Sequence, residues 1–154
     1  MKKVLLFALA CVLVATGSAL ADREVRLPNS RYSIDVPDWM RYSAPEEVDG
    51  DMQAYVSEML EIDYTSYRKE EALAQGMPDT LRETAQKRAA AGADTELRNV
   101  NGIEMLCFRA KDETDGAFCI GYVFEDGEWL VEVDFWYASE EAARLTADII
   151  STIH

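Results

Sequence analysis

Three runs of sequence decide the fold: IEMLCFRA (residues 103–110), AFCIGYVF (117–124) and WLVEVDFWY (129–137). Each run is rich in β-branched and aromatic residues, as strands are, and turn-forming residues separate the runs. Asp126 and Gly127 predict a two-residue hairpin turn, in which both positions require a positive φ. The three runs therefore predict an antiparallel meander.

The register of this meander is predicted from the hairpin turn and from two cysteines. The turn places Glu125 opposite Glu128, and across the longer connection at residues 111–116 we pair Cys107 with Cys119. Because side chains alternate between the two faces of a strand, these registers put the rings on one face and both sulfur atoms on the other. The predicted core face comprises Leu106, Phe108, Phe118, Ile120, Tyr122, Phe124, Trp129, Val131, Val133 and Phe135.

The elements around the meander place it in the α+β class. Ser139 is expected to cap a final helix with a buried stripe at Ala142, Leu145, Ile149 and Ile153. The sequence also predicts a helix from Thr80 to Gly92, because Thr80 and Glu83 have the spacing of a capping box. Strands are predicted over 24–27, 32–36 and 60–67, a strand or a helix over 53–59, and a helical turn over 69–75. Trp39 is expected in the core. We therefore expect an antiparallel sheet with helices packed on it.

Residues 1–21 have the parts of a cleavable signal peptide: two lysines, an apolar run over 4–14 and a small-residue cleavage site ending at Ala21. The run is too short for a permanent membrane anchor. A lipoprotein modified at Cys11 is the less favoured alternative, because its apolar segment would be short. We expect a single secreted or periplasmic domain over residues 22–154.

The charge and the cysteines of this domain restrict its partners. The chain has a formal net charge of −14, which argues against binding to nucleic acid or to anionic lipid. No stretch after the leader is apolar enough to cross a membrane. In an exported domain the pair Cys107 and Cys119 predicts a disulfide, which would lock the strand register.

The sequence offers little for catalysis. His154 is the only histidine and the last residue, where we expect a frayed end. No nucleophile elbow, zinc-protease helix or phosphate-binding glycine loop is present. A hydrolase with two carboxylates is the remaining enzymatic alternative, but no pair stands out. We predict no catalytic residue, no cofactor and no metal site.

Two acidic turns could hold calcium through several carboxylate oxygens. One contains Asp112, Glu113 and Asp115, and the other contains Asp49 and Asp51. Neither follows the twelve-residue EF-hand pattern. Solvated turns are the favoured interpretation of both.

The face of the meander opposite the predicted core carries Arg109, Glu132, Asp134 and Trp136. An aromatic ring beside an arginine and two carboxylates could form a patch that binds a ligand or a partner. The favoured alternative is an ordinary sheet face, in which Arg109 pairs with Asp134 and Trp136 packs under a helix or a loop.

Three short phrases, in this order, resemble the PsbP-like α/β/α sandwich. They are YSIDVPDW (residues 32–39), NGI (101–103) and IISTI (149–153). This fold occurs in extrinsic proteins of photosystem II, in DcrB-type bacterial envelope proteins and in a nuclear-transport cofactor, and the whole chain also resembles small secreted bacterial proteins. The resemblance implies a non-enzymatic role, but it transfers no functional residue, because the fold carries unrelated functions.

The sequence thus favours an exported, non-catalytic interaction or scaffolding domain that docks on an envelope or extracellular protein. The alternative is a small-ligand or metal-binding protein that uses the face of Arg109, Glu132, Asp134 and Trp136.

Overall fold

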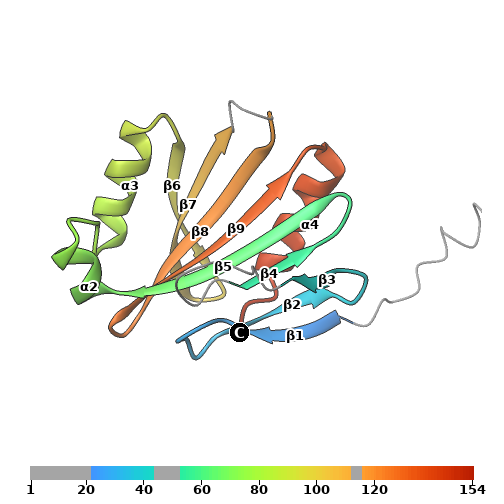
Figure 1. Ribbon diagram of the computed structural model, residues 1–154, viewed down its shortest axis with the longest axis horizontal. Helices are drawn as coiled ribbons and strands as arrows, with labels where there is room; N and C mark the ends of the chain where they lie inside the picture. The colour runs from blue at the N-terminus through green and yellow to red at the C-terminus, as the bar shows by residue number, and fades with distance from the viewer. Residues whose placement is uncertain (1–21, 44–52, 112–115) are drawn as a thin grey trace, which may run out of the picture.

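The computed structural model describes residues 22–43, 53–111 and 116–154. A seven-stranded antiparallel sheet has the strand order β3-β4-β5-β9-β8-β7-β6, and β1 and β2 form a separate hairpin (Figure 1). The elements are β1 (Asp22–Arg26), β2 (Ser33–Pro37), β3 (Arg41–Ser43), β4 (Gln53–Val56), β5 (Leu60–Arg68), α2 (Lys69–Ala74), α3 (Leu81–Ala90), β6 (Asp94–Val100), β7 (Ile103–Lys111), β8 (Phe118–Asp126), β9 (Trp129–Tyr137) and α4 (Glu140–Ile150). The predicted α+β class is confirmed.

Both faces of the sheet are covered. On one face, here the α4 face, the hairpin β1–β2 and helix α4 enclose the larger core, which includes Tyr64, Tyr122 and Phe135. On the other, here the α3 face, Leu81 of helix α3 packs in a smaller cluster with Leu106 and Phe108. The large sheet therefore has two apolar faces, as a three-layer sandwich requires.

The predicted register between β7 and β8 is wrong, and so is the disulfide. Cys107 lies opposite Tyr122, and Cys119 lies opposite Ala110. The observed register differs from the predicted one by an odd number of residues, so each side chain of β7 lies on the face opposite to the predicted one. Cys107 is therefore on the α4 face, whereas Cys119 is on the α3 face. Both cysteines are free and buried. Alternation could not reveal the error, because β7 is apolar on both faces.

The partition of β8 and β9 into faces is as predicted, although their register differs by two residues. Asp126 lies opposite Trp129, so the turn consists of Gly127 and Glu128. Gly127 has a φ of 61°, and neither Asp126 nor Glu128 has a positive φ. Glycine at the first turn position fits a type II′ hairpin. A shift of two residues preserves alternation, so each side chain of these strands stays on its predicted face.

The helix caps agree with the sequence. Ser139 Oγ accepts a hydrogen bond from the backbone N–H of Ala142 at 3.2 Å, and Thr80 Oγ1 accepts one from the backbone N–H of Glu83 at 3.3 Å. The Glu83 carboxylate accepts from the backbone N–H of Asp79, at 3.5 Å, rather than from Thr80. Each cap satisfies an N–H group that the first helical turn leaves without a partner.

Three details differ from expectation: the end of the chain, the position of Trp39, and the two edge strands of the sheet. The last residue, His154, is not frayed, because its backbone N–H donates to Ser33 O at 3.1 Å and its carbonyl accepts from Ser33 N at 2.9 Å. Trp39 is 37% exposed, and Met40 fills the core instead. The edge strands β3 and β6 were not predicted, because each is short or polar.

Some predictions lie outside the described residues. These are the signal peptide and the two acidic turns with Asp49, Asp51, Asp112, Glu113 and Asp115. Within residues 22–43, 53–111 and 116–154, no helix is both long and apolar enough to cross a bilayer.

Candidate binding site

The structure divides the predicted patch between the two faces of the sheet. Arg109 lies on the α4 face, opposite Ile120, and its Nη1 is 3.8 Å from Oδ2 of the exposed Asp94. Glu132, Asp134 and Trp136 remain together on the α3 face, where their strand β9 pairs with β5. The predicted contact between Arg109 and Asp134 is therefore absent, because the register of β7 reverses the side on which Arg109 emerges.

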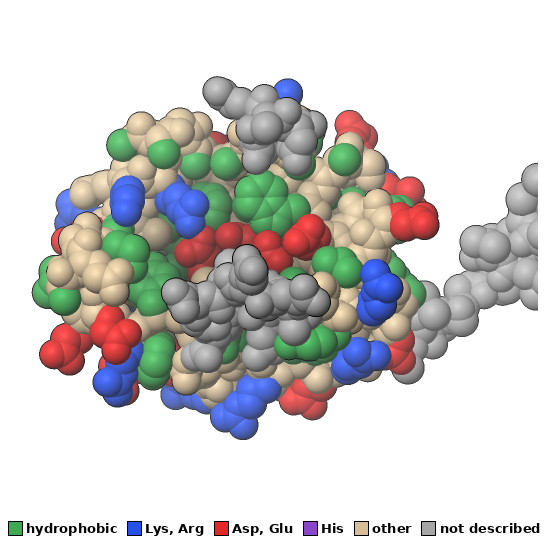
Figure 2. All heavy atoms as spheres, viewed as in Figure 1, with side chains coloured by type: hydrophobic (Ala, Val, Ile, Leu, Met, Phe, Trp, Pro, Cys, Tyr) green, Lys and Arg blue, Asp and Glu red, His purple; other side chains and the backbone are tan. Residues whose placement is uncertain are grey.

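Strand β5 adds two acidic residues to the α3 face. Asp63 lies directly opposite Asp134, and Glu61 lies directly opposite Trp136. Figure 2 shows acidic side chains gathered in a hollow near the middle of this face, with hydrophobic side chains around them. We call the group of Glu61, Asp63, Glu132, Asp134 and Trp136 the acidic hollow.

Helix α3 supplies the cation that Arg109 was expected to provide. Arg88 forms an ion pair with Glu132, and its guanidinium carbon lies 4.2 Å from the centre of the Phe108 ring. The sequence contained one signal for this residue. Leu81, Thr84 and Arg88 have the spacing of one helical stripe, and the first two are buried.

Asp134 is the most constrained carboxyl group of the hollow. Its Oδ1 is buried and has no hydrogen-bond partner among the described residues. Gly121 makes room for this atom, because a Cβ at position 121 would lie 2.4 Å from it. Burial, followed by the charge of Glu132, raises the pKa of Asp134 to about 8.

The neighbouring carboxyl groups are also held towards their protonated forms. Burial, and then the charge of Glu61, raise the pKa of Asp63 to about 6, although a hydrogen bond from Trp136 opposes the shift. Burial also raises the pKa of Glu132, despite the charge of Arg88. Burial, with little positive charge nearby to offset it, thus favours the protonated forms of these carboxyl groups.

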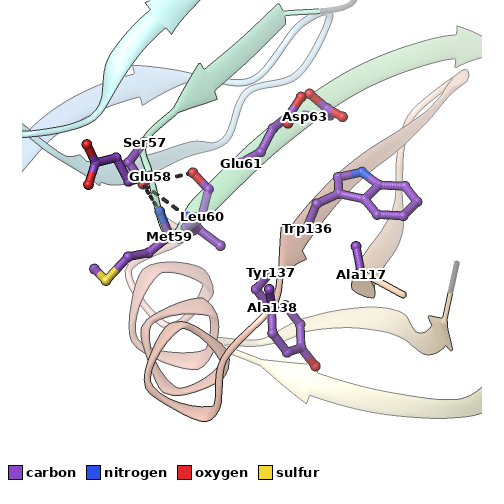
Figure 3. A pocket seen from close by; sticks show the side chains of 10 residues that line it. All are labelled: Ser57, Glu58, Met59, Leu60, Glu61, Asp63, Ala117, Trp136, Tyr137 and Ala138. Atoms are coloured by element: carbon purple, nitrogen blue, oxygen red, sulfur yellow. Dashed lines mark hydrogen bonds between the residues drawn. The ribbon is translucent and has the colours of Figure 1, made fainter. Parts of the chain in front are cut away.

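Two cavities adjoin the acidic hollow. One, of about 460 Å³, lies at the end with Asp63 and Trp136 and extends to Met59 and Tyr137. In Figure 3 the carboxyl groups of Glu61 and Asp63 lie side by side, and Trp136 projects from the neighbouring strand beside them. The other cavity, of about 410 Å³, is lined by Arg88 and Glu132 among others. The cavities reach Glu61, Asp63 and Trp136 at one end of the hollow and Glu132 at the other.

The hollow combines carboxyl groups with an aromatic ring on two neighbouring strands. Within the described part of the chain, no three or more His, Cys, Asp or Glu side chains are arranged to hold a metal ion. Carboxylates beside an indole ring suit an ammonium or guanidinium group, which gains from both charge and ring contact.

Sandwich architecture and strand order together define a PsbP-like fold. The solution structure of cyanobacterial PsbP (CyanoP) from Synechocystis matches with a TM-score of 0.62 and 10% identity, over 90% of this chain and 95% of that one. A crystal structure from Bacteroides thetaiotaomicron matches with a TM-score of 0.57 and 11% identity, over 80% of this chain and 44% of that one. No protein-family model and no curated protein sequence matches. At these identities the likeness establishes the fold alone.

Proposed function

We propose that the protein is an exported, non-catalytic binding domain whose acidic hollow accepts a lysine or arginine side chain of an envelope or extracellular partner protein. The observation that carries this proposal is the pairing of Asp63 directly opposite Asp134 without a basic partner. Like charges directly opposite each other destabilise a sheet. Without a ligand a bound proton relieves this repulsion, and an incoming cation would take the place of that proton.

The balance of charge in the hollow supports a cationic ligand. Among the described residues, Arg88 is paired with Glu132, and no lysine, arginine or histidine forms an ion pair with Glu61, Asp63 or Asp134. Of these three groups, only Asp134 feels the charge of Arg88, which lowers its pKa against the effect of burial. A buried carboxylate without a partner costs free energy that a ligand cation would recover.

Arg88 itself illustrates the chemistry that the hollow can bind. Its guanidinium group is held between a carboxylate, Glu132, and an aromatic ring, Phe108. The open end of the hollow repeats this combination with Asp63 and Trp136, whose side chains share a hydrogen bond. A second guanidinium or ammonium group would find an equivalent set of contacts there.

Two further features support an exported and non-catalytic role. The pattern of residues 1–21 is that of a secretory leader. The only histidine, His154, lies beside Glu24 of the β1–β2 hairpin, on the α4 side of the sheet, and so is away from the acidic hollow. The side chains that adjoin the hollow are suited to binding a cation and to holding protons.

Titration calorimetry with a tetra-arginine peptide tests the proposal, with a tetraglutamate peptide and calcium chloride as comparison ligands. We expect the arginine peptide alone to bind, and the double variant Asp63→Asn/Asp134→Asn to weaken it about tenfold or more. Glu70→Gln/Glu71→Gln makes two equivalent acid-to-amide substitutions at exposed positions on α2 and should bind like the wild type. Equal loss in both variants, or binding of calcium in preference to the peptide, would refute the proposed ligand class.

A further inference from the structure

Within the part of the chain that the structure describes, strand β6 forms one edge of the seven-stranded sheet and pairs with β7 alone. It is seven residues long, and most of its side chains are exposed, including Leu97 at 54%. Helix α3 contacts β6 as well, but from the sheet face. The outer edge therefore presents backbone N–H and C=O groups that an added strand could pair with.

We propose that two copies of this chain pair through their β6 edges, antiparallel and centred on Leu97, so that the sheet continues across a twofold axis. In this register Glu96 of each copy lies opposite Arg98 of the other, and Thr95 lies opposite Asn99. The two charge pairs are related by the symmetry of the dimer. This is the self-complementary arrangement that an isologous interface requires.

The charge pattern of β6 selects this register over its neighbours. A centre at residue 96 would pair Asp94 with Arg98 but would place Glu96 opposite its own copy, and a centre at 98 would place Arg98 opposite its own copy. A centre at residue 95 would place Asp94 opposite Glu96. Like charges directly opposite each other destabilise a strand pair, whereas opposite charges stabilise it.

The two charge pairs would also reinforce the contact that already exists within each copy. Arg98 Nη2 lies 2.7 Å from Glu96 Oε2 of the same strand. Because both side chains project from the same face of β6, the dimer would bring four charges of alternating sign together. Each charge would then have an opposite charge both along its own strand and across the axis.

The size and charge of the interface set the expected strength. One edge strand buries less surface than a standard stable interface, so a weak dimer is expected. The formal charge of −14 on each chain opposes association at low ionic strength. Dimers should therefore form at high protein concentration and physiological salt.

A charge-swap experiment tests both the interface and its register, with sedimentation equilibrium as the measurement. We expect Glu96→Arg and Arg98→Glu each to be monomeric, because each places like charges opposite each other twice. An equimolar mixture of the two variants should regain the dimer, because every opposed pair is then complementary. A control variant at exposed Glu70, Glu70→Arg, should dimerise like the wild type.

Three results would overturn the inference. The first is a wild-type protein that stays monomeric at the highest attainable concentration. The second is dimerisation of the single variants as strong as that of the wild type. The third is a mixture that remains monomeric although the wild type dimerises. Glu96 is exposed and Arg98 is partly exposed, so circular dichroism should show unchanged folding.

Discussion

The ring of Phe108 occupies the space that a side chain at position 121 would need. A Cβ on Gly121 would lie 2.0 Å from Cζ of Phe108 and 2.2 Å from its Cε1. These two residues face each other on neighbouring strands β7 and β8. Because Arg88 lies over the same ring, the missing side chain at 121 also determines where the cation of the acidic hollow is held.

Gly121→Ala should destabilise the fold by about 1–3 kcal/mol, because the buried ring of Phe108 must move to admit the methyl group. Urea unfolding followed by circular dichroism measures the change. In the double variant Gly121→Ala/Phe108→Leu, the smaller side chain leaves room for the methyl group. Gly121→Ala should therefore cost less in a Phe108→Leu background than in the wild type, and an equal cost in both backgrounds would show that Phe108 is not the obstacle.

The sequence predicted the fold well where the side chains on one face of a strand were clearly apolar and those on the other face were polar. In β9 the alternate residues Val131, Val133 and Phe135 are apolar, whereas Glu132 and Asp134 between them are charged. The assignment of side chains to the two faces was therefore unambiguous. In β7 the side chains on both faces are apolar, since Met105 and Cys107 pack on one face while Leu106 and Phe108 pack on the other. Only the assumed disulfide decided between them, and it decided wrongly.

The acidic hollow could be predicted only in part for a related reason. Glu132, Asp134 and Trp136 belong to one strand, and alternation alone places them together. Asp63 and Arg88 reach the hollow through the pairing of β5 with β9 and the packing of α3. These long-range contacts follow from the topology of the sheet, which local patterns do not specify.

Both cysteines of the folded domain should be free thiols that react slowly. Cys107 and Cys119 are buried on opposite faces, and burial raises the pKa of each thiol. We expect mass spectrometry to find almost no alkylation of native residues 22–154 after brief exposure to iodoacetamide. The same protein unfolded without reductant should gain two labels. A protein that gains labels only after reduction would contradict the structure.

Stability should fall as the pH rises from about 4 to about 8. Folding raises the pKa of Asp63 from 3.8 to about 6 and that of Asp134 from 3.8 to about 8. A carboxyl group with a raised pKa stabilises the fold below its unfolded value, and this contribution is lost as the pH passes its folded value. Urea unfolding at pH 5 and pH 8 should differ by on the order of 1–3 kcal/mol.

A neutral variant separates this local effect from the repulsion of the whole acidic chain. Asp134→Asn resembles the protonated acid, so its stability should depend less on pH and exceed that of the wild type at pH 8. Glu70→Gln removes one exposed charge on α2 and should keep the wild-type dependence. If Asp134→Asn and Glu70→Gln show the same pH dependence, the hollow does not hold the protons.

Asn101 joins the turn between β6 and β7 to the end of the chain, and its backbone and side chain should contribute separately. Its φ is 51°, and its Nδ2 donates to Ser151 O at 2.8 Å and to Ile153 O at 2.9 Å. Asn101→Gly loses the two hydrogen bonds but keeps the backbone unstrained, whereas Asn101→Ala loses both advantages. Thermal unfolding should therefore rank the wild type above Asn101→Gly, and Asn101→Gly above Asn101→Ala by about 1 kcal/mol. Equal stability of the two variants would show that the positive φ carries no cost at this turn.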